Sequence, residues 1–195
     1  MNLIFATHNR NKFEEVKSQM PPGIALGYLG DLTHEPPVAE TAETLKGNAE
    51  LKMMALAKGT GLNCFADDTG LEVAALDGAP GVYSARYAGP EAKDFDNVQK
   101  LLKALEGNSN RQARFRTVIA LYWEGSIHFF EGVCRGTILE APIGHGGFGY
   151  DPVFMPEGYE VSFAQMSLQQ KAQISHRGLA MKQLINWLTN RAKER

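Results

Sequence analysis

Residues 111–138 have the sequence RQARFRTVIALYWEGSIHFFEGVCRGTI, and this stretch decides the fold class. Two long runs rich in apolar residues, 111–123 and 127–138, flank Glu124 and Gly125. Such runs separated by so short a turn predict an antiparallel hairpin rather than a strand–helix–strand unit. Because helical patterns occur on both sides of the hairpin, we predict an α/β fold with a mixed β-sheet flanked by helices.

The rest of the chain alternates between strand and helix patterns. The expected strands are residues 2–6, 24–29, 63–66 and 71–76, the last two on either side of an acidic turn at 67–70. The expected helices are residues 11–20, 44–58 and 95–105, and one final helix that begins at the capping-box pair Ser167 and Gln170. Loops are expected at 31–43, 77–92 and 140–160.

Length and composition limit the function classes. A chain of 195 residues fits a single domain, 1–195, or one domain with two lobes. The net charge of -2 argues against binding to nucleic acids or anionic membranes, and no apolar run is long enough to span a bilayer. The two cysteines, Cys64 and Cys134, lie in apolar runs and are expected to be buried free thiols. We therefore expect a cytoplasmic location.

The segment Thr7-His8-Asn9-Arg10-Asn11-Lys12 follows the first expected strand and begins the first expected helix. Backbone N–H groups at a helix N-terminus favour an anion, and Lys12 adds a positive charge. The segment therefore predicts a phosphate-binding loop. The alternative is an ordinary helix cap with a solvated lysine, and the glycines of a P-loop are absent.

The second polar segment is Phe65-Ala66-Asp67-Asp68-Thr69-Gly70, in which two carboxylates follow an apolar run. Successive strand residues point to opposite faces, so Asp67 and Asp68 need not have the same role. Magnesium takes oxygen ligands and uses one or two carboxylates together with substrate phosphates. One of these acids is a candidate metal ligand that also orients a water molecule. The alternative is a turn with two solvated acids.

Three further segments carry candidate binding groups. Arg86 lies between Tyr83 and Tyr87 and suits either a phosphate contact or a structural cation stacked on the rings. The glycine-rich segment 144–152 contains Phe148 and Tyr150, whose rings are candidate stacking partners for a base, and Asp151, a candidate acceptor. Lys171, His176 and Arg177 form a third set that is suited to donating hydrogen bonds to a carbonyl oxygen. Turn, core and solvated-helix roles remain the alternatives for these segments.

The five segments in this order resemble the inosine/xanthosine triphosphate pyrophosphatase family (Ham1-like). They are Thr-x-Asn-x-x-Lys, Ala-Asp-Asp-Thr-Gly-Leu, Pro-Gly-Val-Tyr-Ser-Ala-Arg-Tyr, Gly-Gly-Phe-Gly-Tyr-Asp-Pro and Ile-Ser-His-Arg-Gly. The resemblance implies hydrolysis of ITP, dITP and XTP to the monophosphate and pyrophosphate, with Mg²⁺ as the cofactor. It also implies a homodimer and an elongated mixed sheet with two lobes around a central substrate cleft.

The resemblance also implies residue roles. Asp68 matches the proton acceptor and a metal ligand, and Glu40 matches the second metal ligand. The implied substrate-binding residues are Thr7, His8, Asn9, Arg10, Asn11, Lys12, Lys52, Thr69, Phe148, Gly149, Tyr150, Asp151, Lys171, His176 and Arg177. Two positions depart from the family pattern: His8 replaces a frequent glycine, and Gly47 replaces a frequent glutamate. The Gly47 departure leaves Glu40, or else Glu43, as the candidate second acid.

Other functions are also compatible with these residues. A Maf-like pyrophosphatase would act on modified pyrimidine nucleotides by the same class of reaction. A non-catalytic nucleotide sensor would keep the phosphate and base contacts without a metal at Asp68. The expected partner in each case is a small nucleotide, and neither nucleic acid nor membrane is expected.

Overall fold

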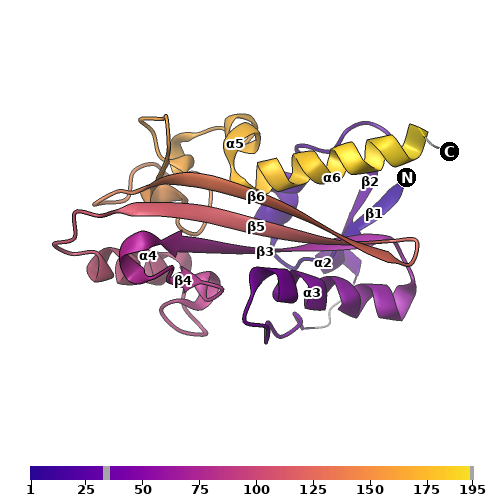
Figure 1. Ribbon diagram of the computed structural model, residues 1–195, viewed down its shortest axis with the longest axis horizontal. Helices are drawn as coiled ribbons and strands as arrows, with labels where there is room; N and C mark the ends of the chain where they lie inside the picture. Colours follow the sequence, from indigo (N-terminus) through magenta and orange to yellow (C-terminus); the bar gives the residue numbers. More distant parts are fainter. Residues whose placement is uncertain (33–35, 194–195) are drawn as a thin grey trace. The chain divides into compact units, whose positions relative to one another are not determined.

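Strands and helices alternate along the chain in the computed structural model, which describes residues 1–32 and 36–193 (Figure 1). The strands are β1 (Asn2–Phe5), β2 (Ala25–Tyr28), β3 (Cys64–Val73), β4 (Pro80–Gly81), β5 (Gln112–Trp123), β6 (Ser126–Ile138) and β7 (Phe154–Pro156). The α-helices are α1 (Arg10–Lys17), α2 (Leu29–Leu32), α3 (Leu45–Thr60), α4 (Asp94–Ala104), α5 (Leu168–Ile174) and α6 (His176–Lys193). Short 3₁₀ helices cover Ala74–Leu76, Ser84–Arg86, Asp151–Val153 and Phe163–Gln165.

The sheet is mixed, as the sequence predicts. Its strand order is β2-β1-β3-β5-β6-β7, and β4 pairs with β3 outside this path. β1 is parallel to both β2 and β3, whereas β4 and β7 are antiparallel to their partners. The predicted hairpin is formed by β5 and β6, and its two turn residues, Glu124 and Gly125, have φ values of 48° and 87°. Positive φ at both positions matches the twist of the flanking strands.

The chain divides into two compact units, in agreement with the two lobes that the family resemblance implied. Unit 1 contains Met1–Asp68, Thr117–Gly132 and His176–Arg195, and unit 2 contains Thr69–Arg116 and Val133–Ser175. The boundaries cut β3, β5 and β6, so each of these strands contributes residues to both units.

Unit 1 packs a helix on each face of its part of the sheet, as Figure 1 shows for α6 and α3. Phe65 lies in the cluster that contains α6 residues, whereas its neighbours Cys64 and Ala66 lie in the cluster that contains α3 residues. The rings of Phe5 and Phe65 stack with their centroids 4.6 Å apart. This alternation follows from the two-residue period of a strand, and it sets the direction of the residues that come next in β3.

Helix α3 begins at the N-cap Thr44, whose side chain accepts a hydrogen bond from the backbone N–H of Gly47. The sequence predicted an end at Lys58, but the helix continues through Gly59 to Thr60 and ends at Gly61, whose φ is 67°. Gly61 suits this left-handed C-cap because it has no Cβ. The buried side chains of α3 are Leu45, Asn48, Ala49, Met53 and Ala57.

The first helical turn of α6 lies directly against β6 at Gly132. A Cβ on Gly132 would meet the carbonyl oxygen of His176 and would lie 2.6 Å from the backbone nitrogen of Ala180. Only glycine permits so close an approach of helix and strand. The start of α6 is buried as a result, with His176 3% and Arg177 2% exposed.

Unit 2 covers one face of its part of the sheet with α4 and with loop side chains. Leu71 and Val73 of β3 pack in one cluster with Val98, Leu101 and Leu105. Burying such side chains contributes about 1.5–3 kcal/mol each. Within the described residues, no helix is long and apolar enough to cross a membrane.

Two further expectations about the secondary structure were wrong. The expected acidic turn at 67–70 is part of one continuous strand, β3, which ends at Val73 and is followed by a 3₁₀ helix. The expected single final helix is two helices, because Ser175 adopts an extended conformation between α5 and α6. The capping box at Ser167 exists, but it begins the shorter helix α5. Residues 33–35 of the expected loop 31–43 lie outside the described part of the chain.

Candidate active site

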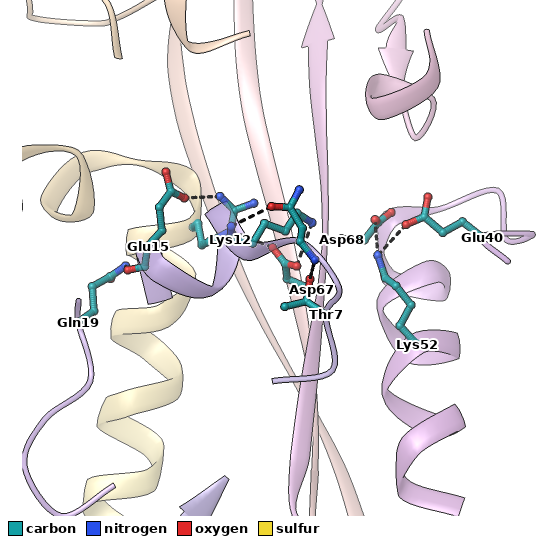
Figure 2. Close-up of polar contacts among 10 residues, drawn as sticks. Thr7, Lys12, Glu15, Gln19, Glu40, Lys52, Asp67 and Asp68 are labelled. Carbon is teal, nitrogen blue, oxygen red and sulfur yellow. Dashed lines mark hydrogen bonds and ion pairs between the residues drawn. The ribbon is translucent and has the colours of Figure 1, made fainter. Parts of the chain in front are cut away.

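The two adjacent acids of β3 are both buried, and they face opposite sides of the sheet. Asp67 is 3% exposed and Asp68 is 4% exposed. Asp67 lies on the side where Phe65 packs with α6, and Asp68 lies on the side where Cys64 and Ala66 pack with α3. Figure 2 shows the resulting two clusters of charged side chains on either side of β3.

The Asp67 side of the strand carries two ion pairs. Oδ1 of Asp67 accepts a hydrogen bond from Lys12 Nζ at 2.9 Å, and Oδ2 accepts one from Arg177 Nε at 2.9 Å. Arg177 also donates from Nη1 to Oε2 of Glu15 at 2.5 Å. Glu15 belongs to the same helix as Lys12, so α1, β3 and α6 are joined through Arg177.

The charges of this cluster balance, since Lys12 and Arg177 oppose Asp67 and Glu15. Burial alone would raise the pKa of Asp67, but Lys12 and Arg177 outweigh burial and hold that pKa below its ordinary value. Burial alone would lower the pKa of Arg177, but Asp67 and Glu15 raise it. For Lys12 burial dominates, and its pKa is lowered. Asp67 therefore stays ionised and serves as a counter-ion.

On the Asp68 side of the strand, two carboxylates share one lysine. Lys52 Nζ donates to Asp68 Oδ1 at 2.8 Å and to Glu40 Oε1 at 2.8 Å, so both carboxylates converge on one ammonium group (Figure 2). Oδ2 of Asp68 is buried and has no hydrogen-bond partner among the described residues. Burial raises the pKa of Asp68 despite Lys52, which makes this carboxylate a stronger proton acceptor than Asp67.

Lys52 lies within α3, and Glu40 lies in the loop that precedes this helix. Burial alone would lower the pKa of Lys52, but Asp68 and Glu40 outweigh it and raise that pKa. The loop that carries Glu40 is fixed because Asn48 Oδ1 accepts a hydrogen bond from the backbone N–H of Ala42 at 2.9 Å. A Cβ on Gly47 would lie 2.6 Å from Cβ of Ala42, so glycine lets this loop approach the helix closely.

The predicted phosphate-binding loop, residues 7–12, has the backbone of a helix N-terminus. Asn9 is the N-cap of α1, and its side chain accepts a hydrogen bond from the backbone N–H of Lys12. Oγ1 of Thr7 accepts a hydrogen bond from the backbone N–H of Asn9 at 3.1 Å. The Tyr28 hydroxyl donates to the carbonyl oxygen of His8 at 2.7 Å, which fixes the loop from the side of β2.

Other side chains of this loop point away from the cluster. Arg10 pairs with Glu14 at 2.9 Å, and its guanidinium lies over the rings of Phe13 and Tyr28. Arg10 and Asn11 are both exposed. Arg10 is therefore occupied by contacts along its own helix, and a direct phosphate contact from its side chain stays a prediction.

The glycine-rich segment and Lys171 form a separate group in unit 2. Asp151 Oδ2 accepts hydrogen bonds from Lys171 Nζ at 2.5 Å and from the backbone N–H of Phe148 at 2.9 Å. The Lys171 ammonium lies 5.0 Å from the centre of the half-buried Phe148 ring. The Asp151–Lys171 pair thus fixes the loop that presents Phe148. The backbone N–H of Gly149 donates to Asp94 at 2.6 Å.

The ring-stacking interpretation of Tyr150 is wrong, because this ring is 4% exposed and lies in the core of unit 2. Its hydroxyl donates to the carbonyl oxygen of Ser84, and burial raises its pKa. Tyr150 therefore belongs to the core of unit 2. The Arg86 guanidinium lies 5.3 Å from the centre of the Tyr83 ring, which fits the structural alternative, and a phosphate contact from Arg86 stays untested.

Most of the predicted site residues belong to unit 1, namely residues 7–12, Glu40, Lys52, Asp68, His176 and Arg177. The other predicted residues belong to unit 2, namely Thr69, Phe148–Asp151 and Lys171. Thr69 follows Asp68 directly in β3. A groove of about 670 Å³ in unit 2, lined by Arg114, Arg135 and their neighbours, contains none of the predicted site residues.

Three residues of the site were missed in the sequence: Glu15, Tyr28 and Asn48. A buried acid one helical turn after Lys12 is a usable signal for Glu15, because positions i and i+3 lie on the same helix face. The Tyr28 and Asn48 contacts depend on how a strand and a loop pack, and no local pattern marks them.

The donor set fits a divalent cation that prefers oxygen ligands. Glu40 and Asp68 converge on one point, and Asp68 has a buried oxygen without a partner among the described residues. Within the described part of the chain, no group of three or more His, Cys, Asp or Glu residues is placed to hold a metal ion. Two carboxylates are the number that magnesium uses when phosphate oxygens and water complete its shell.

Comparisons with known proteins agree with this geometry. The model of the Ham1 family matches residues 3–187. A dITP/XTP pyrophosphatase of Christiangramia forsetii is 51% identical over 189 residues, which are 97% of this chain and 100% of that protein. A dITP/XTP pyrophosphatase of Porphyromonas gingivalis is 52% identical over 187 residues, covering 95% of this chain and 96% of that protein.

Solved structures show the same similarity. The Staphylococcus aureus Ham1 protein superposes with a TM-score of 0.87 at 38% identity, covering 98% of this chain and 100% of that chain. A HAM1 protein from Coxiella burnetii superposes with a TM-score of 0.88 at 39% identity, covering 97% and 99% of the two chains.

Proposed function

Because this chain belongs to the Ham1 family, we propose that it hydrolyses dITP, ITP and XTP to the nucleoside monophosphate and pyrophosphate. The observation that carries the proposal is the buried carboxylate of Asp68, one oxygen of which pairs with Lys52 while the other has no hydrogen-bond partner among the described residues. Such a group can orient and deprotonate a water molecule for attack on the α-phosphorus. The enzyme would thereby remove non-standard purine nucleotides from the nucleotide pool.

We assign the metal ligands to Asp68 and Glu40, and we propose Mg²⁺ as the ion. A magnesium ion held there would neutralise phosphate charge and stabilise the leaving pyrophosphate. Asp67 is not assigned to the metal, because both of its oxygens are occupied by Lys12 and Arg177.

We assign the phosphates to Lys12, Lys52 and the backbone N–H groups at the start of α1. The partial positive charge of a helix N-terminus favours a phosphate at this position. Thr7 and Asn9 shape the loop that carries these groups, through the hydrogen bonds of the N-cap. The role of these residues is to position the triphosphate for attack, which is the main source of acceleration in phosphoryl transfer.

We assign the purine to the loop that presents Phe148, whose ring is a stacking surface held by Asp151 and Lys171. Inosine and xanthosine carry a carbonyl at the purine 6-position where adenine carries an amino group. A site with hydrogen-bond donors at that position discriminates strongly between them, because the amino group leaves the donors unpaired.

Arg177 and His176 are the predicted donors to that carbonyl. The ion pairs of Arg177 limit how this prediction can be tested. The guanidinium of Arg177 already donates to Asp67 and Glu15. Replacing Arg177 by alanine would leave two buried carboxylates without this partner, so Arg177→Ala is not a clean test of base recognition. A direct comparison of substrates tests selectivity without that complication.

The deciding experiment measures pyrophosphate release from dITP, ITP, XTP, ATP, GTP, dTTP and UTP with Mg²⁺, and again with a chelator. We expect release from the first three substrates and none with the chelator. Release chiefly from dTTP and UTP would favour the Maf-like alternative, and no release at all would favour a nucleotide sensor. The family match over residues 3–187 supports the purine assignment.

Asp68→Asn tests the role of the carboxylate itself. We expect turnover to fall at least about 100-fold, the scale of a lost general base, while the circular dichroism spectrum stays unchanged. Near-normal turnover of a folded Asp68→Asn protein would refute the assignment.

We also propose that the enzyme is a cytoplasmic homodimer. The two free and buried cysteines, Cys64 and Cys134, support a reducing compartment. Sedimentation equilibrium at micromolar protein concentration tests the oligomeric state, and a monomer at all concentrations would contradict it.

A further inference from the structure

One ammonium group is shared by the two acids assigned to the metal. Lys52 Nζ lies 2.8 Å from Glu40 Oε1 and 2.8 Å from Asp68 Oδ1 (Figure 2). The side chains of Lys52, Glu40 and Asp68 are 16%, 25% and 6% exposed. A single positive charge thus occupies the point on which two carboxylates converge, as a divalent cation would.

The Asp68 carboxylate is incompletely satisfied on this side of β3. Its Oδ1 accepts from Lys52, whereas its Oδ2 is buried without a hydrogen-bond partner among the described residues. An unsatisfied buried acceptor is unfavourable, so this carboxylate retains capacity for a further ligand.

The other side of β3 provides the contrast. Oδ1 of Asp67 accepts from Lys12, Oδ2 accepts from Arg177, and Arg177 also pairs with Glu15. Two cations therefore oppose two anions, and both oxygens of Asp67 are satisfied. The two adjacent aspartates are similarly buried, but within the described part of the chain only Asp67 has a hydrogen-bond partner at both carboxylate oxygens.

Lys52 can leave its position without disturbing the fold. It lies within α3, whose Ala49 and Met53 are buried against the sheet and hold the helix in place. The lysine side chain is a flexible four-carbon stem with a compact charge at its end. Rotation about side-chain bonds can move the ammonium toward solvent or toward a bound anion while the backbone of α3 stays fixed.

We propose that the Lys52 ammonium is an exchangeable counter-ion of the Glu40–Asp68 pair. It neutralises the two carboxylates while no divalent cation is bound, and it moves to a phosphate oxygen of the substrate when a cation takes its place. This inference rests on the proposed function and adds that the cation and the nucleotide bind cooperatively. Without a nucleotide, the cation must displace an ammonium that has no other anion to bind.

The test measures the binding of Mn²⁺ alone, by electron paramagnetic resonance, to the full chain in the absence of nucleotide at about pH 8. We compare wild type, Lys52→Met and Lys12→Met. Lys52→Met is expected to bind Mn²⁺ at least about tenfold more tightly than wild type, because a competing charge in contact with both ligands is gone. Lys12→Met is the matched control: Lys12 contacts Asp67 and acts on Asp68 only at longer range, so its gain in Mn²⁺ affinity is expected to be clearly smaller than that of Lys52→Met.

An equal or weaker affinity of Lys52→Met for Mn²⁺ would overturn the proposal, and so would an equal gain in Lys12→Met. Should the Met variant fail to fold, Lys52→Gln removes the charge and keeps a polar head group, and the same expectation applies to it. Thermal melting adds a second readout: Mn²⁺ should raise the melting temperature of the Lys52 variant more than that of wild type.

These outcomes are separate from a failure of the proposed function, because Mn²⁺ binding requires no turnover. Release of pyrophosphate from dITP by wild type, with no gain in Mn²⁺ affinity on removing the Lys52 charge, would reject the counter-ion role alone. A gain in Mn²⁺ affinity in a protein that hydrolyses none of the triphosphates would retain the exchange of Lys52 for a cation and reject the hydrolase.

Discussion

Asp67 and Asp68 are consecutive residues of β3, yet their carboxylates contact different helices: Asp67 pairs with Lys12 of α1 and Arg177 of α6, whereas Asp68 pairs with Lys52 of α3. The alternation of a continuous strand separates an acid paired with two buried cations from the acid that we propose as the proton acceptor. Because the two acids have different partners, an aspartate-to-asparagine substitution at each position tests each acid separately.

Asp67→Asn is expected to destabilise the fold, because it removes the charge that compensates Lys12 and the buried Arg177. Breaking a buried ion pair from one side costs about 3–5 kcal/mol, whereas Asp68→Asn leaves Lys52 paired with Glu40 and should cost about 1 kcal/mol or less. Urea unfolding of both variants measures the difference. Equal losses of unfolding free energy would contradict the division of roles.

Tyr28→Phe is expected to raise the KM for dITP about fivefold with little change in folding. The substitution keeps the ring that packs on Phe13 but removes the hydrogen bond to the His8 carbonyl, which contributes about 1 kcal/mol. Steady-state kinetics measures the effect. Tyr159→Phe is the control, because Tyr159 is 45% exposed and lies in unit 2. An unchanged KM in Tyr28→Phe would show that the loop keeps its conformation without this bond.

Gly132→Ala is expected to destabilise the protein by at least about 1–3 kcal/mol, because the added Cβ meets the backbone of His176 and Ala180. Gly59→Ala in α3 is the matched control, because a Cβ at this position would meet no other atom. It should stabilise the protein by about 0.5–1 kcal/mol. Chemical unfolding of the two variants gives both values. A neutral Gly132→Ala would mean that α6 can move away from β6 at no cost.

Both thiols should be unreactive in the native state. Burial raises the pKa of Cys64 to about 12, and burial together with Glu157 raises that of Cys134 to about 11. Unfolded thiols ionise near about pH 8.5, so the raised values stabilise the fold below that pH and the contribution is lost as the pH rises towards 11. Ellman's reagent at about pH 8 should label both cysteines only after unfolding, and rapid labelling of the native protein would contradict their burial.

The sequence predicted the mixed sheet because that prediction rested on the long hairpin, whose apolar runs and turn are local signals. It failed at residues 67–70, where Asp, Thr and Gly are typical of turns but the strand continues. Pairing of Leu71 and Glu72 with β4 extends β3 beyond that point, and such pairing is not visible in the local pattern. Tertiary contacts outweighed local turn preference here.

The sequence supplied candidate residues for the site, but it did not supply their partners. The order of five segments led to Asp68, the family resemblance added Glu40 and Lys52, and the roles of all three stay predictions. The contact between Arg177 and Glu15 joins residues 162 positions apart, and that between Arg177 and Asp67 joins residues 110 positions apart. No spacing rule predicts such pairs, so a residue expected to bind a base was found paired with two carboxylates.

The division of unit 1 into three chain segments has a consequence for protein synthesis. Its last segment begins at His176, and Arg177 in that segment is an ion-pair partner of Asp67. A ribosome must therefore release nearly the whole chain before the ionic cluster around Asp67 can assemble. A prematurely terminated product lacks this cluster, so incomplete chains are expected to be recognised by proteases as unfolded rather than to persist as partly active enzyme.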